Sequence, residues 1–189
     1  MDHRADLLEA ALRLFADHGY DAVGVQSIVE AAGVTKPTLY HYFGSKQGLF
    51  ETLVREKAEG LLAVVSRASH YQGNITCSIK EVVRSYFDYA ASEPLFYRMV
   101  LSMWFAPPGS EYSAAVLGLL DRQTALLEEM FRLAAGDHGN MRSRQRQYAV
   151  SLKGLIDTYV GVWLQSGLDL SSADIQARIV HQFMHGVFS

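Results

Sequence analysis

Cysteine is almost missing from the sequence, because Cys77 is the only one in 189 residues. A disulfide within one chain and a zinc site built on cysteines are therefore excluded, and we expect a reducing, cytoplasmic compartment. Apolar runs of membrane length are missing too. The uncharged stretch from Met99 to Ser110 contains two prolines and a glycine and falls short of the roughly 18 apolar residues of a membrane span. Charged residues recur near the N-terminus, which predicts that no secretory signal begins there.

An excess of positive charge is also absent. The formal net charge is -3 at pH 7, so a surface that binds nucleic acid would have to be a local patch. Apolar residues, by contrast, make up 49% of the chain, which is high for a soluble protein of this length. We therefore expect part of the apolar surface to meet a second subunit or to line a pocket.

Strand patterns are absent as well, since no segment alternates apolar and polar residues between turn signals. Apolar residues instead recur at helical spacing, as Leu8, Ala11, Leu12 and Phe15 do near the N-terminus. Glycines, prolines and capping residues divide the chain into segments. The sequence predicts an all-α fold, with helices over about residues 2–18, 25–32, 36–43, 46–70, 79–90, 94 onward, 110–135, 143–165 and 172–188.

The segment from Val25 to Phe50 contains two short helical patterns joined by a turn that includes Gly33. This arrangement is typical of a helix-turn-helix, whose second helix enters the major groove of DNA. A proline in the first turn of that helix costs nothing, because its missing N–H would be unpaired anyway. Leu39 and Phe43 are four residues apart and can face the core. The residues then left exposed are Thr35, Lys36, Pro37, Thr38, Tyr40, His41 and Tyr42.

Acidic residues are absent between Ala31 and Phe50, although residues 1–57 as a whole contain more acidic than basic side chains. The window holds two lysines and a histidine, which suits a surface that approaches phosphates. Lys46 stands at the start of the next helix, with Ser45 as its expected cap. Free N–H groups and the helix dipole also favour an anion there. We therefore expect the DNA-binding patch to lie within this window.

The string GVTKPTLYHYFGSKQGLF resembles the signature of the TetR (tetracycline repressor) family of bacterial transcriptional regulators, and the match extends from Leu7 to about Leu53. The resemblance implies a repressor that binds a double-stranded DNA operator as a homodimer and leaves it when a small-molecule effector binds. It also implies an N-terminal three-helix helix-turn-helix domain over residues 1–45. A C-terminal helical domain over residues 46–189 would bind the effector and form the dimer. Beyond about Ala58 the resemblance is architectural only.

The resemblance also implies site residues, carried over by position. Bases would be read by Lys36, Pro37, Thr38 and His41, phosphates would be held by Tyr40, Tyr42 and Lys46, and further DNA contacts would come from Gln26, Ser27 and Thr35. The sequence departs from the family at Gly24, where Thr or Ser often opens the second helix. We therefore expect a helix cap, and with it one phosphate contact, to be lost.

Aromatic and methionine side chains are frequent in the middle of the chain. Each one alone is more simply interpreted as ordinary core, but the group suits an adaptable apolar cavity with a few hydroxyls that orient a ligand. Sparse charge between Met99 and Leu120 argues against a highly charged effector. We expect a small, largely apolar effector of unknown identity that contacts Tyr89, Tyr97, Met103, Trp104, Tyr159 and Trp163.

The last two predicted helices carry apolar residues on more than one face, whereas a surface helix needs a single apolar stripe. The excess predicts a four-helix interface in a two-fold dimer. Its expected contacts are Leu152, Ile156, Val160, Ile179, Phe183 and Val187. Such a dimer would present two recognition helices to major grooves about 34 Å apart, or a multiple of that distance, on a near-palindromic operator.

Other interpretations stay open at this point. An enzyme is disfavoured, because no nucleophile–base pair or Gly-rich phosphate loop stands out, and no cofactor is expected. His181 and His185 are four residues apart, but helix surface or a subunit contact explains them more simply than a metal site. A carrier of apolar ligands that does not bind DNA would leave the surface from Thr38 to Tyr42 unexplained. A constitutive DNA-binding regulator with a filled core would need no effector.

Overall fold

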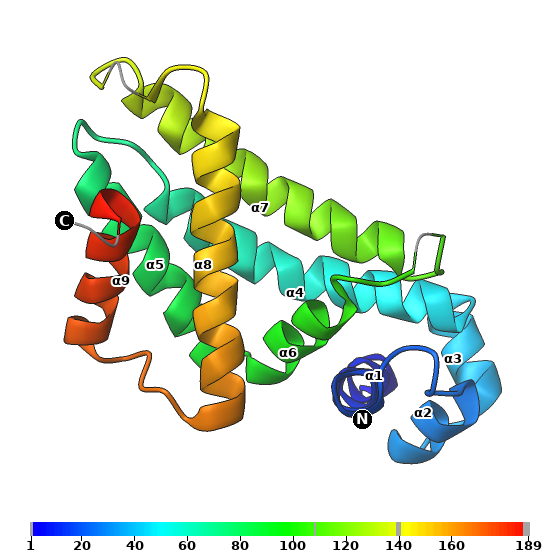
Figure 1. Cartoon of the computed structure of the whole chain (residues 1–189). Coiled ribbons are helices and arrows are strands. Elements are labelled where there is room, and N and C mark those ends of the chain that lie inside the picture. The colour runs from blue at the N-terminus through cyan, green and yellow to red at the C-terminus, as the bar shows by residue number, and fades with distance from the viewer. Residues whose placement is uncertain (1, 108, 139–140, 187–189) are drawn as a thin grey trace. The chain divides into compact units, whose positions relative to one another are not determined.

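The computed structural model describes residues 2–107, 109–138 and 141–186. Over these ranges the chain forms helices and no strand (Figure 1), which confirms the predicted all-α fold. The helices are α1 (His3–His18), α2 (Val25–Ala31), α3 (Lys36–Phe43), α4 (Lys46–Ala68), α5 (Ile75–Ser92), α6 (Pro94–Met103), α7 (Ser113–Ala134), α8 (Gln145–Ser166) and α9 (Ala173–His185). Phe188, at the predicted end of the last helix, lies outside the described residues.

Capping residues and glycines set the helix ends that the sequence predicts. The Asp2 carboxylate accepts hydrogen bonds from two backbone N–H groups in the first turn of α1, at 3.1 and 3.2 Å. The Ser45 hydroxyl accepts from the N–H of Gly48 at 2.9 Å, which confirms Ser45 as the cap of α4. Gly44 has a φ of 73°, a conformation that glycine adopts without steric cost, and it ends α3.

The chain divides into two compact units, each assembled from separate stretches of sequence. Unit 1 comprises residues 1–59 and 95–119, and unit 2 comprises residues 60–94 and 120–189. Two borders fall within α4 and α7, and the third follows Pro94, the first residue of α6, so each of these helices contributes residues to both units. This division follows packing, whereas the predicted boundary between residues 45 and 46 divides the chain by function and stays a prediction.

The core of unit 1 brings α1, α2 and α3 together. α1 packs against both α2 and α3, and these two also pack against each other. Leu7 and Phe15 from α1, Ile28 from α2 and Leu39 from α3 are each 0% exposed, as is Phe50 at the start of α4. These side chains hold the helix-turn-helix in one arrangement, because a fully packed core leaves little room for alternatives.

The core of unit 2 lies along α5, which packs against both α8 and α9 (Figure 1). Ile79, Val82 and Val83 on α5 are fully buried, and so is Leu152 on α8. None of the helices in the described part of the chain combines the length and the apolar character that crossing a membrane requires.

Candidate nucleic-acid interface

α3 is a short helix with a defined start and end. Gly33, with a φ of 65°, allows the turn before it, in which the N–H of Val34 reaches the C=O of Val29 at 2.9 Å. Thr35 is the extended residue at the helix start, and Pro37 lies in the first turn. The hydroxyls of Thr35 and Thr38 are 3.0 Å apart and share a hydrogen bond. The helix is therefore fixed at both ends before any partner binds.

One side of α3 faces the core and the other faces solvent. Leu39 is fully buried and Phe43 is half-buried, as their spacing predicts. Tyr40 and Tyr42 remain 48% and 44% exposed, which is high for tyrosines. Exposed or half-buried side chains cover the rest of this side, namely Thr35, Lys36, Pro37, Thr38 and His41. The structure thus gathers the predicted α3 residues on a single outward surface, which we call the α3 surface.

α2 adds two further predicted side chains, Gln26 and Ser27, and both are exposed. The Gln26 side-chain amide donates a hydrogen bond to Glu30 one turn later, so it would have to leave that partner to reach a base. Gly24 begins α2 without a side-chain hydrogen bond, which confirms the loss of the cap that its sequence position predicts.

Lys46 is oriented differently from the expected phosphate contact. Its Nζ donates hydrogen bonds to the backbone C=O groups of Tyr20 and Val23, at 3.1 Å each. The same ammonium group lies 4.0 Å from the centroid of the Tyr20 ring. Lys46 therefore fastens the start of α4 to the turn between α1 and α2.

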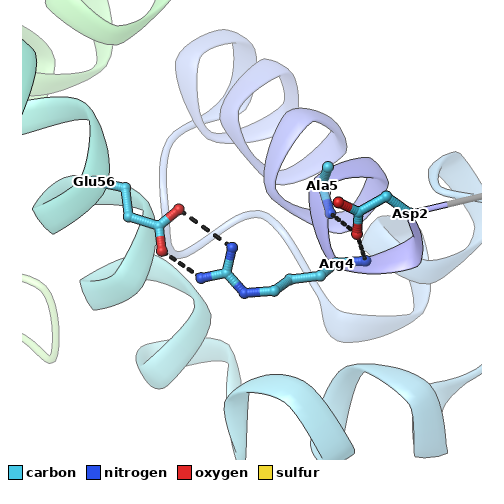
Figure 2. Close-up of polar contacts among 4 residues, drawn as sticks. All are labelled: Asp2, Arg4, Ala5 and Glu56. Carbon is cyan, nitrogen blue, oxygen red and sulfur yellow. Dashed lines mark hydrogen bonds and ion pairs between the residues drawn. The ribbon is translucent and has the colours of Figure 1, made fainter.

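Arg4 connects three helices of unit 1 at the other end of α1. Its guanidinium forms a two-pronged ion pair with the Glu56 carboxylate on α4 (Figure 2). It also lies 5.8 Å from the centroid of the Phe43 ring, at the end of α3. Two-pronged Arg–carboxylate pairs fix orientation as well as distance. Sequence reasoning missed this pair, because its partners are far apart along the chain.

The six predicted effector contacts fall into two groups of three. Tyr97 and Met103 are buried in unit 1, where Trp104 is half-buried and stacks on Phe105. Tyr89, Tyr159 and Trp163 are half-buried in unit 2. Within unit 2, a cleft of about 870 Å³ lies between the second half of α4 and α5, and Tyr89 is the only predicted contact among its lining residues. Most of the lining residues are of polar types, including Arg67, Arg84 and Asp88.

A buried polar cluster in unit 2 escaped the sequence analysis. The Lys153 ammonium and the Asp157 carboxylate form an ion pair within α8, and both side chains are almost completely buried. The same ammonium lies 5.4 Å from the centroid of the Tyr86 ring on α5. The Tyr86 hydroxyl is buried without a hydrogen-bond partner. Burial lowers the pKa of Lys153 and raises that of Tyr86, because both charged forms lose hydration.

The predicted dimer contacts require a correction. Leu152, Ile156, Val160 and Ile179 are buried within the single chain, each 0 or 1% exposed, so they belong to the core of unit 2. Helical periodicity shows that a face is apolar but not what covers it. Phe183 is half-buried, with its ring 6.2 Å from that of Phe131, and Val187 lies outside the described residues.

Other apolar side chains of α8 remain uncovered by the chain itself. Val150 and Val162 are 53% and 44% exposed, and Leu155 and Tyr159 are half-buried. His181 and His185 lie close together on α9, with ring centroids 4.6 Å apart. In the part of the chain that the structure describes, no three metal-binding side chains gather into a possible metal site.

The part of the chain that forms the α3 surface is similar in sequence to known proteins. Residues 7–53 match the family described as bacterial regulatory proteins of the tetR family. The helix-turn-helix region of the chain is of the TetR type. This match agrees with the resemblance that the sequence string predicted, and its limits, Leu7 and Leu53, coincide with the predicted ones.

Three similar proteins extend the comparison. The HTH-type transcriptional activator FasR of Mycolicibacterium smegmatis is 27% identical to this chain, over 87% of this chain and 74% of FasR. The HTH-type transcriptional repressor AcnR of Corynebacterium glutamicum is 43% identical, but the match covers only 33% of this chain and 34% of AcnR. A crystal structure of the transcriptional regulator FadR from Bacillus subtilis, in complex with stearoyl-CoA, shares the fold. It gives a TM-score of 0.80 at 19% identity, over 97% of this chain and 98% of FadR. All three are named as transcriptional regulators, and none as an enzyme.

Proposed function

We propose that this chain is a cytoplasmic repressor that binds a near-palindromic operator as a homodimer and is released by a small, largely apolar effector. The α3 surface carries this proposal. Exposed lysine, histidine and tyrosine side chains on a short helix, backed by a fully buried Leu39, have the composition and geometry of a recognition helix. Two exposed tyrosines on an eight-residue helix would be a liability if no partner covered them.

The proposed contacts follow the exposure of each side chain. Lys36, Pro37, Thr38 and His41 would meet base edges in the major groove, because they lie in the first half or on the outer side of α3. The hydroxyls of Tyr40 and Tyr42 would donate to phosphates on either side. Thr35, together with Gln26 and Ser27 from α2, would add contacts at the edge of the groove. Lys46 is left out of this set, because its ammonium is already held by two carbonyl groups.

The dimer in this proposal forms through uncovered faces of α8 and α9. Val162, Leu155 and Tyr159 follow one another at helical spacing on α8, and they retain exposed apolar area within a single chain. A two-fold partner would cover the same patch on both copies. It would also supply the second recognition helix that a near-palindromic site requires.

The effector in this proposal binds to unit 2. Tyr89, Tyr159 and Trp163 are its proposed contacts there, while Tyr97, Met103 and Trp104 belong to unit 1. The FadR structure holds stearoyl-CoA, so fatty acids, which have its acyl chain without the charged CoA group, form a rational first panel. Release follows if the effector binds better to a conformation that does not fit the operator. α4 is the proposed lever, because it begins beside α3 and its last turns line the cleft of unit 2.

The decisive experiment selects DNA from a randomised duplex pool with the wild-type chain. We expect a near-palindromic site, and we expect the double change Lys36→Ala and Tyr42→Ala to weaken binding to it by about 10- to 100-fold, since base and phosphate contacts are both lost. Helicity and dimerisation should not change. Lys80→Ala is the matched control, because Lys80 is an exposed lysine on α5, far from the α3 surface in sequence.

Two results would contradict the proposal. If no sequence is enriched from the pool, the chain does not bind DNA specifically, and a carrier becomes the better description. If a site is enriched but no compound of the acyl panel or of a wider apolar panel releases it, the effector half fails. The chain would then be a constitutive regulator. Fluorescence anisotropy of the labelled duplex measures both DNA binding and its release by an effector in one assay.

A further inference from the structure

We propose that Tyr20 is a positioning residue for the recognition helix, held by Lys46 at its backbone carbonyl and by Glu111 at its hydroxyl. In this arrangement the Lys46 ammonium binds the backbone at Tyr20 and does not bind a DNA phosphate. The proposal deepens the DNA-binding function put forward above and rests on it. All residues involved belong to unit 1.

Tyr20 lies at the centre of an aromatic cluster. The residue is only 3% exposed, and its ring stacks on Phe15 of α1 with centroids 5.4 Å apart. It meets Phe50 of α4 edge-on at 5.2 Å and Tyr112 at 4.9 Å. Three separate stretches of the chain therefore pack against one ring.

Lys46 holds the backbone of the same residue. Two of its ammonium hydrogens can serve the carbonyls of Tyr20 and Val23, while the Tyr20 ring faces the positive charge at 4.0 Å. The two carbonyls belong to the turn that leads from α1 into α2. Moving Lys46 outward to a phosphate would remove a donor from both carbonyls and leave the Tyr20 carbonyl only the longer bond from the Val23 N–H, at 3.3 Å. Losing these bonds costs free energy in a partly buried site.

Glu111 holds the hydroxyl end of the Tyr20 side chain. The Tyr20 hydroxyl donates to the Glu111 carboxylate at 2.7 Å. Next to it, the Tyr112 hydroxyl points to Asp21 at 3.5 Å, and Arg98 on α6 forms an ion pair with Asp17 near the end of α1. The segment from α6 to the start of α7 is thus tied at two points to the turn before α2 and at a third to the end of α1.

This linkage gives the segment 95–119 influence over the helix-turn-helix. The segment continues along the chain into unit 2 at both of its ends. A change of conformation in α6 or at the start of α7 would reach the turn before α2 through Tyr20, without passing along α4. A tyrosine that only fills the core would contribute through its ring alone. Removing the Tyr20 hydroxyl or the Glu111 carboxylate therefore tests the proposal.

Hydrogen exchange of the full-length chain provides the first test, and it needs no DNA. We expect Tyr20→Phe and Glu111→Ala each to speed amide exchange in residues 20–24 and in α2 by about three- to ten-fold, because local opening no longer breaks the hydrogen bond. The double variant should match the larger single effect, since both changes remove the same bond. Glu59→Ala is the control, because it removes an exposed acid of unit 1 and should leave exchange there unchanged. Unchanged exchange rates in both single variants, or strictly additive effects in the double variant, would overturn the proposal that the Tyr20–Glu111 hydrogen bond positions the helix-turn-helix.

The salt dependence of DNA binding provides the second test, with the duplex selected from the randomised pool as probe. We expect Lys46→Met to weaken binding about ten-fold while the slope of log K against log salt stays at the wild-type value. A lysine that holds a phosphate would instead lower the magnitude of that slope by about 0.9 when removed, which would overturn the assignment of Lys46. Unchanged affinity would overturn it as well.

The two experiments separate failure of this inference from failure of the proposed function. If no duplex is enriched, the DNA-binding function fails, whereas the exchange experiment still decides whether Tyr20 positions the helix-turn-helix. If Lys46→Met does not fold, Tyr20→Phe keeps the test valid, because it removes a single oxygen atom and retains the aromatic packing.

Discussion

At the scale of single residues, the Lys153–Asp157 pair is the least conventional feature of unit 2. Both partners sit in the apolar interface between α8 and α5, where charges lose hydration. Such pairs contribute little net stability, but removal of one partner leaves the other charge buried. Their i, i+4 spacing is visible in the sequence, yet the same spacing is common on exposed helix faces. Burial of the pair therefore could not be predicted.

The pair leads to a stability prediction. Asp157→Asn should lower the free energy of unfolding by about 3 kcal/mol, because the Lys153 ammonium loses its carboxylate in a buried site. The matched change Asp174→Asn breaks the exposed i, i+4 pair with Arg178 on α9, and its cost should stay below about 0.5 kcal/mol. Urea unfolding at one fixed protein concentration measures both. Equal costs for the two variants would mean that burial does not decide the effect.

At the scale of elements, the helix ends around α3 were the most predictable part of the fold, whereas α5 begins four residues before its predicted start and α7 three residues after. Ser45 and Gly44 act as their residue types predict, because capping is a local interaction. Which apolar faces cover one another was less predictable. Leu152 and Ile156 were assigned to a dimer, but α5 of the same chain already covers α8. Contacts such as Arg4–Glu56 and Tyr20–Glu111 could not be predicted, since their partners are distant in sequence.

A substitution at the start of α2 should make the protein more stable. Gly24 has an extended backbone with a φ of -91°, and a Cβ added there would meet nothing within 4 Å. Gly24→Ser should therefore supply the missing cap and raise the free energy of unfolding by a few tenths of a kcal/mol, or about 1 °C in Tm. A phosphate contact from the new hydroxyl should tighten operator binding about two- to five-fold.

Gly44→Ser is the contrasting change at the end of α3. Its φ of 73° is unfavourable for a residue with a Cβ, so we expect a loss of about 1–3 kcal/mol. Differential scanning calorimetry of Gly24→Ser and Gly44→Ser measures both changes in stability. A loss of stability in Gly24→Ser would show that the cap geometry described for α2 is not the one formed in solution.

At the scale of the whole molecule, the uncovered apolar face of α8 is the feature that bears on assembly. Val162 is 44% exposed on a helix whose opposite side is fully packed. Val162→Lys should weaken the proposed dimer by at least ten-fold, because a charge would have to lose its hydration in the interface. Leu133→Lys on α7 is the control, since Leu133 is also an exposed apolar residue, at 39%. Light scattering across a dilution series reports the mass, and a monomeric wild-type chain at micromolar concentration would contradict the dimer.

The segmented make-up of unit 1 has a practical consequence for engineered chimeras. A cut after residue 59 would remove the 95–119 segment, and with it the Tyr112 ring and the Glu111 carboxylate that surround Tyr20. Grafting the first 59 residues onto the sensory half of another regulator would therefore expose aromatic surface at the junction. A chimera that also carries residues 95–119 would keep the helix-turn-helix together with the segment that packs against Tyr20.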